Sequence, residues 1–234
     1  MLSYYIGPFR SGADRPGPSD SGEFPMTPDE VRELLFRDPD PNKSVRKTVG
    51  PSEIGGCRRR VWEKLHGTPV TNPGTLSMAA NFGTAWHSWV EQKLAGDPRF
   101  LLEVKRERDG IRGTVDCFDI ERGMVIDWKT IKLSGIPYFP DKQKRWQVQV
   151  YGWLLSLEYE VQTVCLVGFP RDGTDRDIVS HTEPYDESLA IEALAWLDEV
   201  KAMETEPKPE KRRKFCKDYC GYFDPTGVVG CTGI

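Results

Sequence analysis

Two carboxylates and one lysine stand in adjacent strand-like segments, TVDCFDI and MVIDWKT, which a short polar turn separates. If Glu121 and Arg122 form a two-residue hairpin loop, Asp116 pairs directly with Asp127 and their Cβ atoms lie about 5 Å apart. Lys129 projects from the same face as Asp127, because side chains alternate along a strand. A three-residue loop would shift the register and remove this opposition. The spacing therefore predicts two acids and an amine on one face of a sheet.

The chemistry that suits such a patch is hydrolysis of a phosphodiester. Two neighbouring carboxylates repel, so one would keep its proton unless a cation lies between them. Oxygen ligands suit Mg²⁺ or Mn²⁺, and such an ion would polarise a phosphate oxygen and lower the pKa of a bound water. Lys129 could orient that water or neutralise charge in the transition state. The plain alternative is a surface hairpin that carries scattered charges.

Three further side chains could belong to the same site. His87 lies in an apolar segment with helical spacing, so it is either a core histidine or a third metal ligand. Gln147 and Tyr151 lie one helical turn apart and share a helix face. They could hydrogen-bond a phosphate or a base edge, or they could be ordinary surface residues.

Charge is unevenly distributed along the chain. A net charge of −4 argues against non-specific coating of nucleic acid. Basic residues nevertheless gather at 58–60, 142–145 and 208–217, where they are either solvated faces or contacts with DNA around an acidic metal centre. Four of them are predicted to contact DNA: Arg58, Arg59, Lys144 and Arg145.

The elements that would position these residues follow from periodicity and turn signals. Residues 1–48 are predicted to be a flexible arm, disordered over 1–25, with one short helix that Thr27 and Glu30 begin as a capping box. Residues 49–234 are predicted to form one domain. Its expected helices are 78–94, 142–157 and 186–204, and residues 52–65 are expected to begin as a turn and become a helix. Its expected strands are 100–107, 111–120 and 124–131, which form an antiparallel meander, followed by 161–169 and 177–183.

Four short motifs, in chain order GTAWH, GTVD, DWK and QVQVY, resemble the GxxxH, GxxD, (D/E)xK and QxxxY set of RecB-like nucleases of the PD-(D/E)XK type. The resemblance covers residues 50–234. It implies an α/β fold with a restriction-endonuclease-like core, in which helices flank a central mixed sheet. It also implies a metal-dependent DNA exonuclease that acts on single strands or DNA ends.

The same resemblance assigns roles to individual residues. Four would hold the metal ion: His87, Asp116, Asp127 and Trp128, the last through its carbonyl. Lys129 would be catalytic together with the two aspartates, and Gln147 and Tyr151 would lie beside the DNA. Glu103 resembles an acidic residue often found on the strand before GxxD.

The six cysteines fall into two classes. Cys117 and Cys165 lie in apolar strand-like segments, where a cysteine is usually a small buried residue. The other four have polar, turn-rich surroundings: Cys57, Cys216, Cys220 and Cys231. One upstream cysteine and three near the end resemble the iron–sulfur members of this nuclease family, among them the CRISPR-associated RecB-like exonucleases. The resemblance implies a [4Fe–4S] cluster on these four thiolates, with the cluster segment at 208–231, and a zinc ion is the alternative.

The cysteine spacing departs from the family pattern. Three residues separate Cys216 from Cys220 and ten separate Cys220 from Cys231, where the family more often has two and a shorter gap. A cluster that joins Cys57 to this segment would close a loop of about 160 residues, and it would therefore stabilise the fold.

The sequence has no long apolar run and no secretory signal, which predicts an intracellular protein without a membrane partner, in the cytoplasm of a prokaryotic or phage-infected cell. It also has no GxxxxGK[ST] motif. The expected partners are DNA and a recombination, helicase or CRISPR-adaptation protein. Two alternatives remain, a non-catalytic DNA-end-binding module with the same fold and a zinc-stabilised interaction protein.

Overall fold

The computed structural model describes residues 27–36, 48–72, 78–209 and 213–233 of the 234-residue chain. It divides into two units, residues 1–42 and residues 43–234. The first unit contributes α1 (Pro28–Phe36), which begins with the predicted capping box. There the Thr27 N–H donates to Glu30 Oε2 at 2.7 Å, and the Glu30 N–H donates to Thr27 Oγ1 at 3.2 Å. The predicted disordered arm at 1–25 lies outside the described residues.

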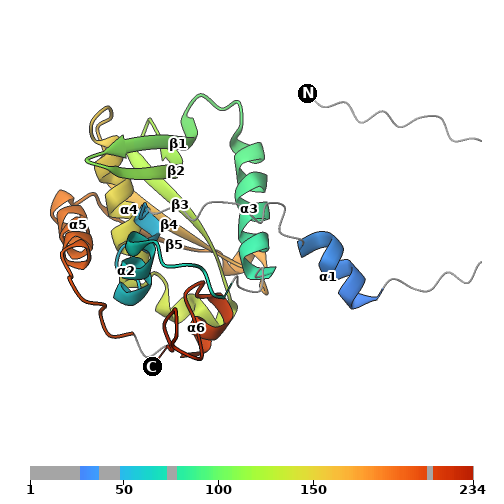
Figure 1. Ribbon diagram of the computed structural model, residues 1–234. Coiled ribbons are helices and arrows are strands. Elements are labelled where there is room, and N and C mark those ends of the chain that lie inside the picture. Colours follow the sequence, from blue (N-terminus) through green and yellow to red (C-terminus); the bar gives the residue numbers. More distant parts are fainter. Residues whose placement is uncertain (1–26, 37–47, 73–77, 210–212, 234) are drawn as a thin grey trace, which may run out of the picture. The chain divides into compact units, whose positions relative to one another are not determined.

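A five-stranded mixed sheet forms the centre of the second unit (Figure 1). Its strands lie side by side in chain order: β1 (Phe100–Arg108), β2 (Ile111–Asp119), β3 (Met124–Ile131), β4 (Thr163–Pro170) and β5 (Val179–Pro184). The first three are antiparallel neighbours as predicted, β4 runs parallel to β3, and β5 runs antiparallel to β4. A parallel pair needs a crossover connection, and the helix between β3 and β4 supplies it.

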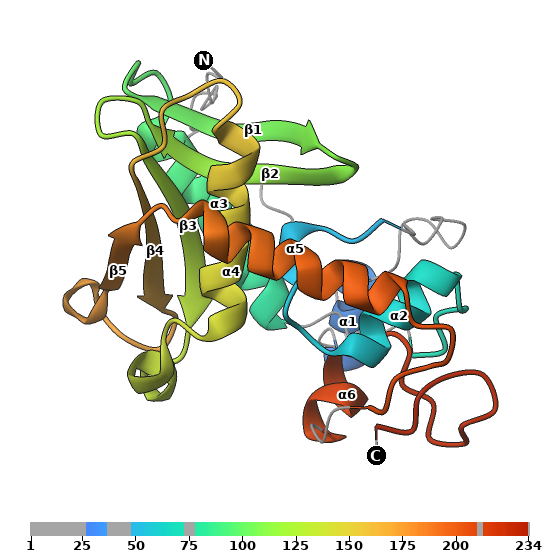
Figure 2. The ribbon, with the colours of Figure 1, turned by 90° about the vertical axis from the view of Figure 1, so that its left-hand side faces the viewer.

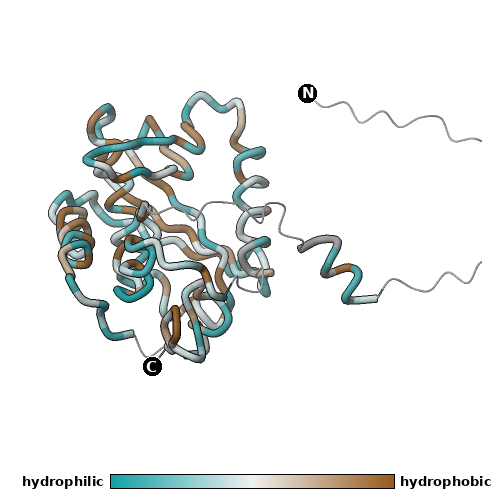
Figure 3. The backbone as a smooth tube through the Cα atoms, in the orientation of Figure 1, coloured by the Kyte–Doolittle hydropathy of each residue, from teal (hydrophilic) through white to brown (hydrophobic). Residues whose placement is uncertain are grey.

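Helices cover both faces of this sheet (Figure 2), so the expected α/β architecture is confirmed. On one face α4 (Lys142–Leu155) and α5 (Glu187–Lys201) enclose the larger apolar core. On the other face α3 (Met78–Leu94) lies over a smaller core around Cys117, Ile126 and Cys165. In Figure 3 hydrophobic and hydrophilic stretches alternate along the sheet and the helices around it, as expected for elements with one buried face.

The remaining elements are short. α2 (Arg58–His66) follows the 3-10 turn η1 (Pro51–Glu53), and α6 (Arg213–Tyr219) lies near the end of the chain beside α2. Two further 3-10 turns, η2 (Leu133–Tyr138) and η3 (Asp175–Asp177), follow β3 and β4. In the described segments, no helix combines the length and the apolar character that crossing a membrane requires.

The hairpin between β2 and β3 has the predicted register. Cys117 pairs with Ile126, and Asp119 pairs with Met124. Four residues rather than two separate the last paired positions, because residues 120 and 123 do not join the ladder. The ladder also ends before it reaches Asp116 and Asp127, and this early end shapes the site.

Candidate active site and candidate cysteine-ligated metal centre

The site begins where the sheet loses its regular pairing. The β1–β2 ladder includes Leu102 with Cys117 and Val104 with Val115, but it omits Glu103 and Asp116 between them. Glu103 has a φ of +50°, a left-handed conformation that is unusual for a residue with a side chain. The packing changes sides at this position, since Leu102 and Cys117 pack in the smaller core and Val104 and Val115 pack in the larger one. Strained backbone of this kind is found most often at functional sites.

Asp116 occupies the gap that opens between β2 and β3. Its Oδ2 accepts a hydrogen bond of 2.9 Å from the backbone N–H of Trp128, so a side chain takes the place of the next ladder bond. The Asp116 side chain is 11% exposed. The predicted direct opposition of Asp116 and Asp127 is thus replaced by a splayed end of the hairpin, which brings Asp116 to the backbone beside Asp127.

Asp127 is fully buried and lies among polar side chains. Lys129 Nζ lies 2.8 Å from Asp127 Oδ1 and 2.6 Å from Oδ2. Gln147 Nε2 lies 3.2 Å from Asp127 Oδ1 and donates to the Tyr151 hydroxyl at 2.9 Å. Despite the nearby ammonium, Asp127 Oδ2 accepts no hydrogen bond from the described residues. Burial raises the pKa of Tyr151, so its phenol stays protonated.

Burial of Gln147 and Tyr151 excludes the alternative that they are ordinary surface residues, since they are only 5% and 6% exposed. The signal was present in the sequence, because the ten residues from Trp146 to Leu155 include no charged side chain. All ten are buried in the structure. A helix without a polar face is buried on all sides.

Three potential ligands converge next to Asp127. Ligand atoms of His87, Glu103 and Asp116 all lie within 4.8 Å of one another. His87 Nε2 lies 2.9 Å from the Trp128 carbonyl oxygen, and His87 Nδ1 lies 3.6 Å from Asp116 Oδ2. The contact of 2.9 Å is a hydrogen bond if Nε2 carries the proton. It also equals the separation of two neighbouring ligands on an octahedral ion with bonds of about 2.1 Å.

The electrostatics of this group favour a cation. Burial and then the charge of the nearby Asp127 raise the pKa of Asp116 to about 7, while Lys129 acts in the opposite direction. Burial and then the charge of Glu91 raise the pKa of Glu103. An imidazole and several carboxylate oxygens around one point are ligands of Mg²⁺ or Mn²⁺, and an ion there would offset the repulsion. The residues present therefore fit a divalent metal.

The four basic residues predicted to contact DNA all form ion pairs within the chain. Arg58 pairs with Glu199, Arg59 with Glu63 and Glu206, Lys144 with Asp141, and Arg145 with Glu183. The pairs of Arg58, Lys144 and Arg145 are partly exposed, and such pairs contribute little to stability, whereas the side chains of Arg59 and Glu63 are only 11% and 3% exposed. The structure thus leaves Arg58, Lys144 and Arg145 open to a ligand and encloses Arg59.

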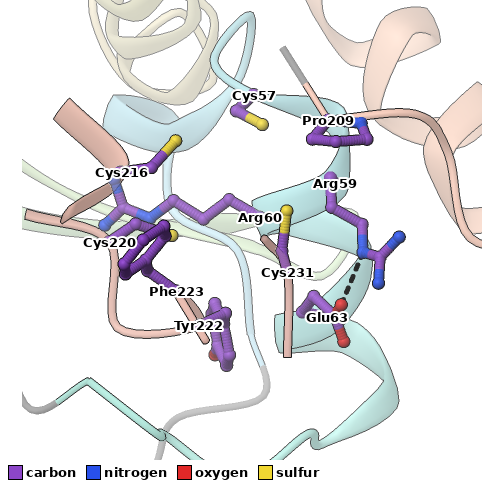
Figure 4. A pocket seen from close by; sticks show the side chains of 10 residues that line it. All are labelled: Cys57, Arg59, Arg60, Glu63, Pro209, Cys216, Cys220, Tyr222, Phe223 and Cys231. Carbon is purple, nitrogen blue, oxygen red and sulfur yellow. Dashed lines mark hydrogen bonds and ion pairs between the residues drawn. The ribbon is translucent and has the colours of Figure 1, made fainter. Parts of the chain in front are cut away.

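The cysteines separate as the sequence predicts. Cys117 and Cys165 are buried under α3, with exposures of 0% and 7%. The other four line one pocket between α2, α6 and the C-terminal loop (Figure 4): Cys57, Cys216, Cys220 and Cys231. Figure 4 shows the Arg60 side chain extending across this pocket toward Cys216 and Cys220.

The chemistry of this pocket fits a thiolate-bound metal centre. All six cysteines are free thiols, and the four in the pocket come from parts of the chain far apart in sequence. Burial raises the pKa of Cys216, Cys220 and Cys231, so these buried thiols would release protons when a metal binds. The guanidinium groups of Arg59 and Arg60 supply positive charge beside them.

Comparison with known proteins gives a family and several similar folds. The family model described as "PD-(D/E)XK nuclease superfamily" matches residues 59–224. The crystal structure of SSO0001 is similar at 20% identity with a TM-score of 0.51, covering 82% of this chain and 89% of that one. An alkaline exonuclease from Laribacter hongkongensis matches at 14% identity and a TM-score of 0.49, covering 68% of this chain and 88% of that one.

A phage-related exonuclease from Haemophilus somnus 129PT matches at 18% identity and a TM-score of 0.42, covering 61% of this chain and 77% of that one. A search of curated protein sequences finds no match for this chain.

Proposed function

This chain belongs to the PD-(D/E)XK nuclease superfamily, and we propose that it is a metal-dependent exonuclease that hydrolyses DNA at single strands or ends. The observation that carries this proposal is the convergence of His87, Glu103 and Asp116 next to the buried pair of Asp127 and Lys129. Prokaryotic or phage recombination, repair or CRISPR adaptation is the setting that the motif resemblance suggests. A helicase or another protein of these pathways would deliver the DNA.

The metal would be held by residues from four elements, α3, β1, β2 and β3. His87 of α3, Glu103 of β1 and Asp116 of β2 supply one cluster of ligand atoms, and the Trp128 carbonyl lies against His87. Asp127 would join them through a carboxylate oxygen, in place of part of its present contact with the Lys129 ammonium. A divalent ion bound there would polarise a phosphate oxygen and lower the pKa of a water.

Lys129 would act on the reacting groups directly. Its ammonium contacts both oxygens of the buried Asp127 carboxylate, and the Lys129 side chain is 21% exposed, so it can reach a water or a phosphate oxygen in the site. A fixed cation at this place would orient the attacking water or stabilise the negative charge that develops on the phosphate. Lys129 is therefore the catalytic residue of the proposal.

Gln147 and Tyr151 would act as positioning residues. Both are buried, and Gln147 contacts Asp127 Oδ1 and Tyr151 at the same time. This placement favours orientation of the Asp127 carboxylate over the contact with DNA that the motif resemblance suggests. A carboxylate held from two sides keeps its geometry when charge moves in the site.

In the cysteine pocket we propose a [4Fe–4S] cluster that joins α2 to the C-terminal segment. The support is the number and type of donors in one pocket. A four-thiolate zinc site, the alternative, holds its sulfur atoms about 3.8 Å apart. In the part of the chain that the structure describes, no three of these thiols lie within 4.8 Å of one another, which favours the larger cluster.

One preparation tests both proposals. The protein is purified without oxygen, and its absorbance is recorded at about 400 nm, where iron–sulfur clusters absorb. Its iron and zinc contents are also measured. It is then incubated with end-labelled single- and double-stranded DNA and Mn²⁺ or Mg²⁺. We expect metal-dependent shortening from the ends, abolished in Asp127→Ala and retained in Asp175→Ala, which removes an exposed carboxylate from η3.

The results separate the candidate functions. DNA binding without turnover in the wild-type protein would identify a non-catalytic end-binding module. A colourless protein with one zinc ion and no activity on DNA would identify a zinc-stabilised interaction protein. Equal cleavage by the wild-type protein and Asp127→Ala would refute the assigned active site.

A further inference from the structure

The long gap between Cys220 and Cys231 is occupied by a loop closed around one carboxylate. Asp224 is 8% exposed. Its Oδ1 accepts hydrogen bonds from the Thr226 N–H at 2.8 Å and the Thr226 hydroxyl at 2.6 Å. Its Oδ2 lies within reach of three successive backbone N–H groups, those of Val228 at 3.1 Å, Val229 at 3.0 Å and Gly230 at 3.4 Å.

The loop has no apolar interior that could replace these hydrogen bonds. Residues 225–229 are all exposed, and Val228 is 81% exposed. Without the carboxylate, the N–H groups of Thr226, Val229 and Gly230 would have only water as a partner, and that of Val228 would keep only a long contact of 3.4 Å with Thr226 Oγ1. The exposed side chains of the loop supply little packing to hold the chain in this conformation. Hydrogen bonds to an ionised acceptor are stronger than neutral ones. Asp224 is therefore the centre on which the loop folds.

The closed loop fixes Cys231 through its backbone. The Cys231 N–H donates to the Tyr222 carbonyl at 2.8 Å, and the Asp224 N–H donates to the Cys231 carbonyl at 2.9 Å. Gly230 allows this close return, since a Cβ at that position would lie 2.5 Å from the Tyr222 carbonyl oxygen. These backbone hydrogen bonds fix the position of Cys231, and they do not involve its thiol group.

A second contact places Cys220 in the same way. The side-chain amide of Asn72, which follows α2, donates to the carbonyls of Lys217 at 3.0 Å and Cys220 at 3.1 Å, and so caps the end of α6. The N–H groups of Thr71 and Asn72 both donate to the Gly221 carbonyl at 3.0 Å. These bonds attach the C-terminal segment to the segment after α2.

We propose that Asp224 is a positioning residue that forms the Cys231 loop before any metal centre is present, so that the centre is inserted into a pocket the chain has already built. In many small metal sites the ligand segment folds only with its metal. The role of the loop as a holder of a metal ligand rests on the metal centre proposed above for the cysteine pocket. The loop itself is expected to form without iron or zinc. The wide spacing of Cys220 and Cys231 then has a physical reason, because the extra residues make up the loop that Asp224 closes.

Hydrogen exchange of the full-length, metal-free, reduced protein tests this proposal. We expect the amides of Val228, Val229 and Gly230 to be protected in the wild type, and to exchange at least about tenfold faster in Asp224→Ala. Asp224→Asn keeps the shape but loses one acceptor and the charge, so it should restore the protection only in part. Val228→Ala is the matched control, because it changes an exposed side chain of the same loop and leaves its N–H in place.

Metal content is the second readout. After reconstitution with iron and sulfide, Asp224→Ala should hold several-fold less iron than the wild type and Val228→Ala an equal amount. Unchanged amide protection in β3 shows that a variant has kept its fold. An unprotected loop in the metal-free wild type, or equal protection in Asp224→Ala, would overturn the proposal. If the loop is protected and the protein takes up neither iron nor zinc, the cluster assignment fails while the role of Asp224 in closing the loop is upheld.

Discussion

Replacing Asp116 by Asn should make the metal-free protein more stable at neutral and alkaline pH, although it should abolish cleavage. The Asp116 side chain is 11% exposed, and burial together with the charge of Asp127 raises its pKa to about 7. Asparagine keeps an oxygen for the Trp128 N–H and loses the charge. The substitution therefore removes the repulsion and keeps the hydrogen bond.

The magnitude and its sign follow from the two pKa values. An unfolded aspartate has a pKa of about 3.9, so its ionised form disfavours the folded chain, and stability falls as the pH rises from about 4 to about 7. At pH 8 the wild type should be less stable than the variant by up to about 4 kcal/mol. Between pH 5 and pH 8 the difference should grow by about 3 kcal/mol, or about 6–12 °C in melting temperature for a chain of this size.

The assay is thermal denaturation of both proteins in EDTA at pH 5, 6.5 and 8. Asp119→Asn is a control of opposite sign on the same strand. Hydrogen bonds from Arg99 lower the pKa of Asp119, because they stabilise its ionised form. Removing the charge of Asp119 should therefore destabilise the protein at pH 8. In saturating Mn²⁺ the wild type should have a higher melting temperature than Asp116→Asn, which is the reverse of the order in EDTA. Equal melting temperatures at pH 8, or a difference that does not change with pH, would show that burial and Asp127 do not raise the pKa of Asp116 in the metal-free site.

Three further substitutions test other parts of the molecule. Lys129→Gln should reduce cleavage by roughly 10²–10³-fold, while calorimetry finds the Mn²⁺ affinity largely unchanged; retained cleavage would show that another group does its work. Glu103→Gln should weaken Mn²⁺ binding roughly tenfold or more in the same titration, and unchanged affinity would remove Glu103 from the ligands. Cys57→Ser should lose the iron absorbance and lower the melting temperature, so normal stability would contradict a metal centre anchored there.

The fold could be predicted because the strands carry strong local signals. Alternating apolar residues and the short turn after Asp119 set the register of β2 and β3, and the pairing of Cys117 with Ile126 confirms it. The splayed end of the hairpin, which replaces the predicted direct opposition of Asp116 and Asp127, could not be predicted. The left-handed conformation of Glu103 interrupts the β1–β2 ladder, and no sequence pattern marks such a residue within a strand.

The partners of Arg58 and Arg145 could not be predicted either, because their acids come from distant segments. Arg58 meets Glu199 of α5, and Arg145 meets Glu183 of β5. A cluster of basic residues in sequence has the same appearance whether or not tertiary structure supplies counter-charges. The loop around Asp224 could be predicted only in part. FDPTG is a typical turn sequence, but the contacts of three N–H groups with Asp224 Oδ2 depend on the folded loop.

One helix connects the two sites. Near its start, Gln143 of α4 donates to the Ser52 carbonyl at 2.8 Å. Trp146 packs against Gly55, where a Cβ would lie only 2.7 Å from the Trp146 ring and where φ is +77°. Gln147, which lies one turn after Gln143, contacts Asp127. The segment that carries Cys57 therefore packs against α4, the helix that also contacts Asp127. A metal centre that anchors Cys57 would on this basis also steady the carboxylate at the proposed site of hydrolysis without taking part in the reaction.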